Sequence, residues 1–341
     1  MQAAVTLSEM GIASVIVEKE ETLGGKLKGW DRLFPTMTPA REVLEPMRER
    51  VSASGAEVLT SRSVLSIEDE GRGVVLDDRT RLDADAVIVA TGGMSYPGTG
   101  STGDGYRIAA ALGHTIVEPR GSLVPLVSDD DCCRHMQGLS LKNVELTVYN
   151  GKNKPVFREF GEMLFTHFGV SGPLVLSASA HLRDWGKEQY RLSIDLKPAL
   201  DQQKLEARIL RDISESPNRD VEKLLCGLVP HSMAPVMTRR LGFPPTLKAN
   251  SLTKEQRRGL VELLKHFTIS VTGVRPVAEA IVTAGGVKVS EVKPNTMESK
   301  LVEGLYFAGE ILDVDAYTGG FNLQIAWATG HLAGVSAAER E

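Results

Sequence analysis

Residues 303–334 constrain the fold more than any other part of this 341-residue chain. They open with a short apolar run, 305–308, which predicts a buried strand. Gly309-Glu310 follows at once, a loop then leads to Gly319-Gly320, and a long apolar segment begins there. Glycines let a backbone approach a ligand closely, and the first N–H groups of a helix carry partial positive charge. A strand, an acid, a glycine pair and a helix in this order are typical of a flavin site, in which the acid accepts hydrogen bonds from ribityl hydroxyls.

The same stretch, GLYFAGEILDVDAYTGGFNLQIAWATG, resembles the carboxy-terminal flavin motif of the BaiN/YhiN-like flavoproteins, a family that includes bile-acid and aminoacetone oxidoreductases. The resemblance implies an α/β fold: a Rossmann-like FAD-binding domain of the two-dinucleotide-binding flavoprotein type, with an inserted β-barrel and helical domain. The alternative is a buried strand–loop–helix that holds no cofactor. The cofactor contacts implied here are Gly309, Glu310, Gly319, Gly320, Phe321, Asn322 and Leu323.

The first twenty residues carry half of a nucleotide-binding pattern. Residues 1–10 predict an amphipathic helix and residues 14–17 a buried strand, with Glu18 and Lys19 at its end. In a dinucleotide-binding βαβ unit, an acid at this place binds the adenosine ribose about 20 residues after the glycine loop. We therefore expect the chain to start inside the motif and to lack its first strand, either as a truncated chain or as a remnant without its phosphate loop. The alternative is an ordinary helix and strand with a chance acid.

A second glycine pair follows that acid, in the segment EKEETLGGKLKGWDRLFPT. Within about the first 70 residues, this segment resembles heterodisulfide-reductase-type flavoproteins, which implies cofactor contacts at Gly25 and Lys26. The Gly-Gly-Gly-Arg-Cys-Asn stretch of the BaiN/YhiN-like pattern is absent. Residues 36–39, TMTP, stand where the heterodisulfide-reductase pattern has cysteines, so no iron–sulfur partner is expected.

Residues 85–93, DAVIVATGG, predict another buried strand that runs into glycines. They resemble the second nucleotide-contacting motif of two-dinucleotide-binding flavoproteins, and the related proteins also make a backbone contact with adenine near Val64. A glycine-rich loop, 95–105, follows and is expected beside the flavin; the alternative is a solvent-exposed loop. The contacts implied by this motif are Ala90, Thr91, Gly92 and Gly93.

The pattern changes after residue 118. Short strands with turn residues between them, then a helix-rich run over 201–266, predict an inserted domain. With the family resemblance, the expected organisation is an FAD-binding domain in two parts, 1–118 and 284–341, interrupted by a β-barrel and helical domain over 119–283.

Composition narrows the classes of partner. Hydrophobic residues make up 42%, charged residues 24%, and the net charge is −5, without a block of Lys and Arg. We therefore expect a small-molecule substrate, no nucleic acid and no membrane, in a cytoplasmic protein, with no expectation for its oligomeric state. Cys132, Cys133 and Cys226 show neither a disulfide framework nor metal-ligand spacing, and no metal is expected.

If FAD binds, the flavin ring supplies the redox chemistry and the protein supplies orientation and a proton. No dedicated NAD(P)H domain is expected, and NAD(P)H is expected to act only as a transient electron donor at the substrate face. Candidate catalytic residues are His167, Arg275 and Tyr317, which fall in or beside the family-like loops; packing or surface roles are the alternative.

Three functions remain open from the sequence. The first is an FAD-dependent oxidoreductase that moves a hydride to or from a small organic substrate through flavin N5, with an NAD(P)H-dependent enone reductase as its specific form. The second is a truncated or non-catalytic flavoprotein remnant. The third is a flavin-dependent RNA-modifying protein, which the acidic composition disfavours.

Overall fold

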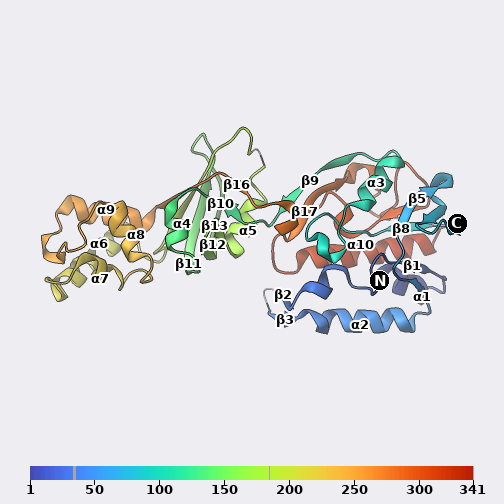
Figure 1. Cartoon of the computed structure of the whole chain (residues 1–341), viewed down its shortest axis with the longest axis horizontal. Helices are drawn as coiled ribbons and strands as arrows, with labels where there is room; N and C mark the ends of the chain where they lie inside the picture. Colours follow the sequence, from blue (N-terminus) through green and yellow to red (C-terminus); the bar gives the residue numbers. More distant parts are fainter. Residues whose placement is uncertain (34–35, 184, 341) are drawn as a thin grey trace. The chain divides into compact units, whose positions relative to one another are not determined.

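The computed structural model describes residues 1–33, 36–183 and 185–340. They form two compact units: Met1–Ser122 with Pro276–Glu341, and Leu123–Arg275 (Figure 1). Below, these are called the split unit and the continuous unit, and each is described by itself.

Two pairs of parallel strands lie in the split unit. β1 (Val15–Val17) pairs with β4 (Glu57–Leu59), and β8 (Val87–Val89) pairs with β18 (Leu305–Phe307). β8 and β18 consist of β-branched or large apolar residues, and all three residues of β18 are buried, whereas β1 and β4 are only partly covered. Strands are present where residues 14–17, 85–93 and 305–308 predicted them, but β1 is not the buried strand expected, because Val15 is 46% exposed.

The remaining elements of the split unit cover these strands or connect them. α1 packs against α10, where Gly334 lies so close to α1 that an added Cβ would be 2.9 Å from the carbonyl oxygen of Ala3. The antiparallel strands β9 and β17 pair where the chain leaves this unit and returns to it. The elements are α1 (Gln2–Glu9), η1 (Gly25–Gly29), β2 (Arg32–Leu33), β3 (Thr38–Pro39), α2 (Ala40–Ala53), β5 (Val64–Glu68), β6 (Gly73–Leu76), β7 (Arg81–Asp83), η3 (Pro97–Thr99), α3 (Asp104–Ala111), β9 (Ile116–Ser122), β17 (Val282–Val287), η7 (Gly309–Ile311) and α10 (Phe321–Ala338).

The larger of two hydrophobic clusters in the split unit joins α3 to β6, β8 and β18. Phe307 and Leu305 of β18 are fully buried, and they belong to one cluster with Ala109 of α3 and Leu76 of β6. The core fixes the direction in which β8 and β18 end, and therefore where the loops after them begin.

The continuous unit combines a seven-stranded sheet with helices. The strand order is β15-β14-β11-β12-β13-β10-β16, and all its pairings are antiparallel. One hydrophobic cluster includes residues of the sheet and of the helices, such as Phe267, Leu205 and Leu260. The elements are β10 (Leu126–Val127), α4 (Asp131–His135), β11 (Ser140–Tyr149), β12 (Pro155–Thr166), β13 (Gly169–Ser171), α5 (Pro173–Ser179), β14 (Tyr190–Asp195), α6 (Gln202–Glu215), α7 (Val221–Leu225), α8 (Ala234–Arg240), α9 (Lys254–Lys265), β15 (Phe267–Val271) and β16 (Gly273–Val274).

The expected β-barrel is not closed. The edge strands β15 and β16 are two halves of one extended segment, with Thr272 between them. The first half pairs with β14 and the second with β10, so β15 and β16 stand at opposite ends of the strand order, and the described residues form no closed barrel. The sheet is therefore open, while the expected α/β class with an inserted strand-and-helix region is confirmed.

Gly285 gives a test of this packing, because it has both an unusual backbone and no room for a side chain. Its φ is +88°, and an added Cβ would lie 2.4 Å from the carbonyl oxygen of Glu118. Gly285→Ala should lower the free energy of unfolding by about 2 kcal/mol or more, measured by urea denaturation. Gly98→Ala is the matched control, because no atom lies within 4 Å of the Cβ that it adds; equal losses in the two variants would contradict the β9–β17 packing.

Candidate functional site

The carboxyl ends of β1, β8 and β18 meet at one place in the split unit. After β1, Lys19 forms an ion pair of 3.0 Å with Asp104, which begins α3. Further along the same segment, Lys26 contacts Glu310, the third residue after Phe307, which ends β18. Ligands of open α/β folds bind beyond the carboxyl ends of parallel strands, where the loops diverge. This is therefore the candidate cofactor site.

Lys26 and Glu310 form a largely buried ion pair. The Lys26 ammonium lies 2.7 Å and 2.8 Å from the two carboxylate oxygens of Glu310. Only 13% of the Lys26 side chain and 20% of the Glu310 side chain are exposed. Burial lowers the pKa of Lys26, although the Glu310 carboxylate acts in the opposite direction. The pair is therefore held in an environment that does not favour an isolated charge.

Two further donors fix the Glu310 carboxylate. Its Oε1 accepts a hydrogen bond of 2.7 Å from the backbone N–H of Thr283 and one of 3.1 Å from the Ser95 hydroxyl. Thr283 Oγ1 in turn accepts the N–H groups of Met94 and Ser95. Oε1 is thus surrounded by protein donors, whereas Oε2 meets Lys26 alone among the described hydrogen bonds.

Close packing explains why glycine stands at the end of β8. A Cβ on Gly93 would lie 2.3 Å from Thr283 Oγ1 and 2.8 Å from Glu310 Oε1. Gly93, which the sequence predicts as a cofactor contact, is therefore required so that the Thr283 and Glu310 side chains can approach the backbone.

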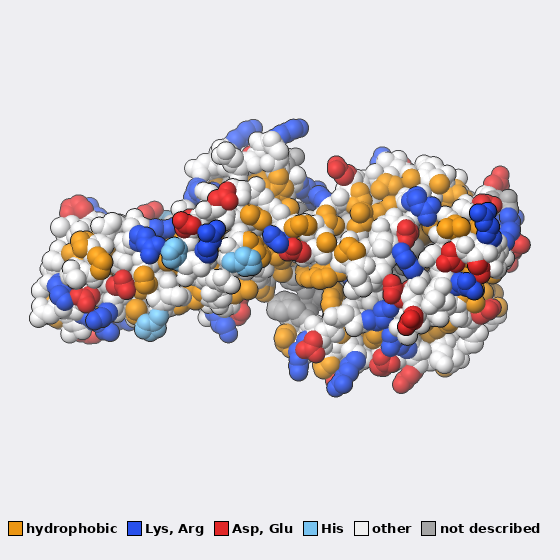
Figure 2. Space-filling model, viewed as in Figure 1, with side chains coloured by type: hydrophobic (Ala, Val, Ile, Leu, Met, Phe, Trp, Pro, Cys, Tyr) orange, Lys and Arg blue, Asp and Glu red, His pale blue; other side chains and the backbone are white. Residues whose placement is uncertain are grey.

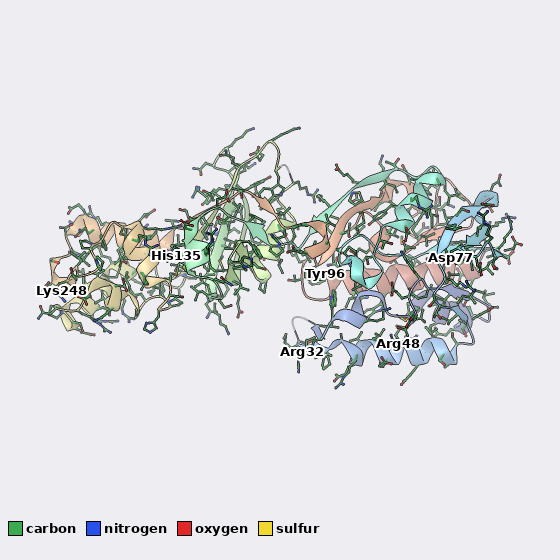
Figure 3. The ribbon with its side chains drawn as sticks, viewed as in Figure 1. Arg32, Arg48, Asp77, Tyr96, His135 and Lys248 are labelled. Atoms are coloured by element: carbon green, nitrogen blue, oxygen red, sulfur yellow. The ribbon has the colours of Figure 1, made fainter. Side chains whose placement is uncertain are left out.

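The turn before Lys26 is held by α2. Arg48, labelled in Figure 3, donates from Nε to the carbonyl oxygen of Leu23 over 3.0 Å. Gly25 adopts a φ of +50°, and the Cβ of any replacement would meet no atom within 4 Å. The backbone at Gly25 thus faces open space beside the ion pair.

The start of α10 offers free N–H groups. Gly320 is the N-cap with a φ of 91°, and no side chain caps the helix. The first backbone hydrogen bond runs from Gln324 N–H to Gly320. Among the described residues, the N–H groups of Phe321, Asn322 and Leu323 have no acceptor. This 18-residue helix can therefore present three N–H donors and its positive dipole end to an electron-rich ligand.

Asn322 and Phe321 differ in what their side chains do. Asn322 closes the preceding loop, because its Oδ1 accepts the Ala316 N–H and its Nδ2 donates to the Ala316 carbonyl. Only its backbone N–H is available to a ligand. The Phe321 side chain is 59% exposed.

The other expected contacts lie around this centre. Glu18 accepts the Glu20 N–H through its Oε1, 3.0 Å away, and so shapes the turn after β1. Val64 begins β5, and Ala90, Thr91 and Gly92 follow β8 directly. The structure brings Lys26, Gly93 and Glu310 into contact; the role of all these residues toward a cofactor stays a prediction.

The three candidate catalytic residues do not form one described cluster. His167 and Arg275 belong to the continuous unit and share Phe168: the His167 ring centroid is 5.0 Å from that of Phe168, and the Arg275 guanidinium carbon lies 4.7 Å from it. Tyr317 belongs to the split unit, in the loop that Asn322 closes.

Sequence reasoning did not single out Ser95 and Thr283. Each lies two residues from a glycine pair, Gly92-Gly93 and Gly285-Gly286, and that proximity was the available signal. Tyr106 was also missed. Its hydroxyl donates to the Glu310 carbonyl over 3.4 Å, and burial, together with the Glu310 and Asp313 charges, raises its pKa.

The residues present fit the FAD that the sequence implies. A buried carboxylate with one oxygen still able to accept a hydroxyl proton suits a ribityl chain, and uncapped N–H groups at a helix start suit the pyrimidine edge of a flavin.

Comparison with known proteins places the chain in a family. A family model described as the HI0933-like protein Rossmann domain matches residues 15–336. A 3-dehydro-bile acid delta(4,6)-reductase of Clostridium scindens is 30% identical over 312 residues, which cover 90% of this chain and 76% of that protein. A ribosomal RNA dihydrouridine synthase of Haemophilus influenzae is 32% identical over 304 residues, which cover 87% of this chain and 72% of that protein.

The chain belongs to the HI0933-like family. This confirms the expected family and the expected class, the FAD-dependent oxidoreductases. Among solved structures, a flavocytochrome c3 fumarate reductase is similar with a TM-score of 0.41 and 17% identity. The match covers 90% of this chain and 57% of that one.

Phe321 allows a test of the α10 site that separates binding from folding. An acid in the first turn of a helix is stabilising, so Phe321→Glu should leave the melting temperature unchanged or slightly raised. The same carboxylate would repel the electron-rich edge of the flavin, and FAD affinity, measured by fluorescence titration, should fall about tenfold. Phe321→Leu is the matched control and should bind FAD as the wild type does. Equal affinity in Phe321→Glu would place the cofactor elsewhere.

Proposed function

We propose that this chain binds FAD with the ribityl chain beside Glu310 and the pyrimidine edge of the ring at the first turn of α10. We further propose that it reduces a C=C bond conjugated to a carbonyl group. The observation that carries the proposal is the Glu310 carboxylate, with Oε1 fixed by protein donors and Oε2 presented beside Lys26.

The choice of reaction is supported by what two relatives share. One is called a delta(4,6)-reductase of a 3-dehydro-bile acid, the other a dihydrouridine synthase of ribosomal RNA. Both names describe the saturation of a C=C bond, in an unsaturated ketone or in a uracil ring. In both molecules a carbonyl group conjugated to that bond can take up the negative charge as a hydride arrives.

The proposed reaction balances with NAD(P)H as the electron donor. When bound, reduced FAD would supply the hydride for the carbon β to the carbonyl, with a proton for the α carbon, and NAD(P)H would supply the two electrons that restore the reduced flavin. Tyr317, which belongs to the same unit as Glu310, is the proposed proton donor.

A small-molecule substrate is the first choice and a uridine in RNA the second. The second is favoured by the dihydrouridine synthase relative. Against it, Lys/Arg and Asp/Glu side chains are interspersed on the face seen in Figure 2, and no continuous basic stripe crosses the described residues there. No helix of the described residues is both long and apolar enough to cross a membrane.

The test begins with the purified chain incubated with FAD and separated from free cofactor by gel filtration. We expect a flavin absorbance band to elute with the protein. Anaerobic addition of NADH or NADPH and a 3-oxo-4,6-diene steroid acid should then remove the dienone absorbance, with one nicotinamide oxidised per double bond reduced.

A parallel reaction replaces the steroid acid by a ribosomal RNA transcript and measures dihydrouridine by mass spectrometry. Dihydrouridine without dienone reduction would favour the RNA substrate. A flavin-loaded protein that reduces neither would contradict the proposed reaction, and a protein that retains no FAD would contradict the proposed cofactor and favour a non-catalytic remnant.

A further inference from the structure

We propose that Lys26 is a positioning residue that keeps the Glu310 carboxylate ionised and holds its Oε2 toward the cofactor side of the site. The part of this inference that concerns FAD rests on the proposed function. The part that concerns the charge of Glu310 can be tested without any cofactor.

The first argument is the mutual dependence of the two charges. Both side chains are mostly buried, and the ammonium contacts both carboxylate oxygens. Removing one partner of a buried ion pair leaves an uncompensated charge, which is strongly destabilising unless that group changes its protonation state. Among the described ion pairs and hydrogen bonds, Lys26 is the cation that contacts the Glu310 carboxylate.

The second argument is that the two carboxylate oxygens of Glu310 have different hydrogen-bond donors. Ser95 and Thr283 donate to Oε1, so these two groups can fix that oxygen without Lys26. Oε2 has Lys26 as its one described donor, and an ionised carboxylate oxygen has room for a second. Lys26 thus determines both the charge and the direction of the oxygen that is left for a ligand hydroxyl.

The third argument is that Lys26 is held from several sides. Besides Glu310, its ammonium donates to the Ser95 hydroxyl and lies 3.4 Å from the carbonyl oxygen of Ile281. It begins in η1, whose preceding turn is fixed by Arg48. The Lys26 ammonium thus contacts three separate segments of the split unit, through Ser95, Ile281 and Glu310, which a lysine with a surface role alone would not need to do.

Other titratable groups face this pair and must be separated from it in a test. Tyr106 donates to the Glu310 backbone carbonyl, and its raised pKa keeps it neutral across the neutral range. Asp313 accepts the Gly285 N–H through Oδ1, so it is held by the neighbouring strand. Lys28, also in η1, is half-buried and donates to the Thr22 carbonyl outside the Glu310 cluster, which makes it the matched control.

The cofactor-free test measures the free energy of unfolding by urea between pH 5 and pH 9. In Lys26→Met, Glu310 should hold a proton in the folded state at a pH where the unfolded chain has lost it. Folding then requires proton uptake, so stability should fall as the pH rises from 5 to 8, relative to the wild type.

Glu310→Gln should show the opposite slope. Without its counter-ion the buried Lys26, whose pKa burial already lowers, should lose its proton in the folded state before the unfolded chain does. The unfolded state then binds more protons, so stability should rise between pH 7 and pH 9. The double variant should show neither slope, and Lys28→Met should follow the wild type.

The cofactor test measures FAD affinity over the same pH range. We expect Lys26→Met to bind FAD at least tenfold more weakly than the wild type at pH 5.5, where Glu310 is protonated, with part of the loss recovered at pH 8, where more of the carboxylate is ionised. Lys26→Arg, which keeps the charge, should restore most of the affinity, whereas a purely structural role of the lysine would give no pH-dependent loss.

The outcomes separate this inference from the proposed function. Single variants without opposite slopes, or a slope that persists in the double variant, would overturn the assignment of Lys26, whatever FAD does. Opposite slopes in a protein that binds no FAD would keep the ion-pair assignment and reject the cofactor. If Lys26→Met has no folded baseline, the slope of Glu310→Gln and the affinity of Lys26→Arg still decide the matter.

Discussion

The split unit depends on a buried ion pair, Lys26–Glu310, that joins segments far apart in the sequence. Lys26 belongs to the segment after β1, Glu310 follows β18, and the two meet Ser95 from the loop after β8 and Thr283 from β17. Breaking a buried pair by removing one partner is costly, so each segment is held in place by the others. The position of the candidate site follows from this contact, because the loops that surround it all carry a member of the cluster.

Local backbone geometry makes that contact possible. At position 93 only glycine leaves room for the Thr283 side chain and the Glu310 carboxylate. Gly320 precedes α10 and leaves the first N–H groups of the helix without a capping side chain. A flavin needs acceptors for its ribityl hydroxyls and donors for its pyrimidine oxygens, and these two features supply them.

Much of this arrangement could be predicted from the sequence, where periodicity and turn chemistry are strong. The run 305–308, followed by Glu310 and Gly319-Gly320, gave the strand, the acid and the start of the helix in the correct order. The Lys26–Glu310 contact could not be predicted, because 284 residues separate the two in the sequence and nothing local pairs a lysine with a distant acid. The open sheet of the continuous unit was missed for a similar reason: whether β15 and β16 close a barrel depends on pairing at a distance. Ser95 and Thr283 are common residue types, and only the fold shows that they share one carboxylate.

The most direct test of the account is amide hydrogen exchange at single-residue resolution, by NMR, with and without FAD. The account predicts that FAD slows exchange of the Phe321, Asn322 and Leu323 amides at the uncapped start of α10 by tenfold or more. The Thr283 amide, already bonded to Glu310, should be protected in both states. FAD binding that leaves the three α10 amides unchanged, or a Thr283 amide that exchanges freely, would contradict the central claim that the Glu310 cluster and the α10 start together form the cofactor site.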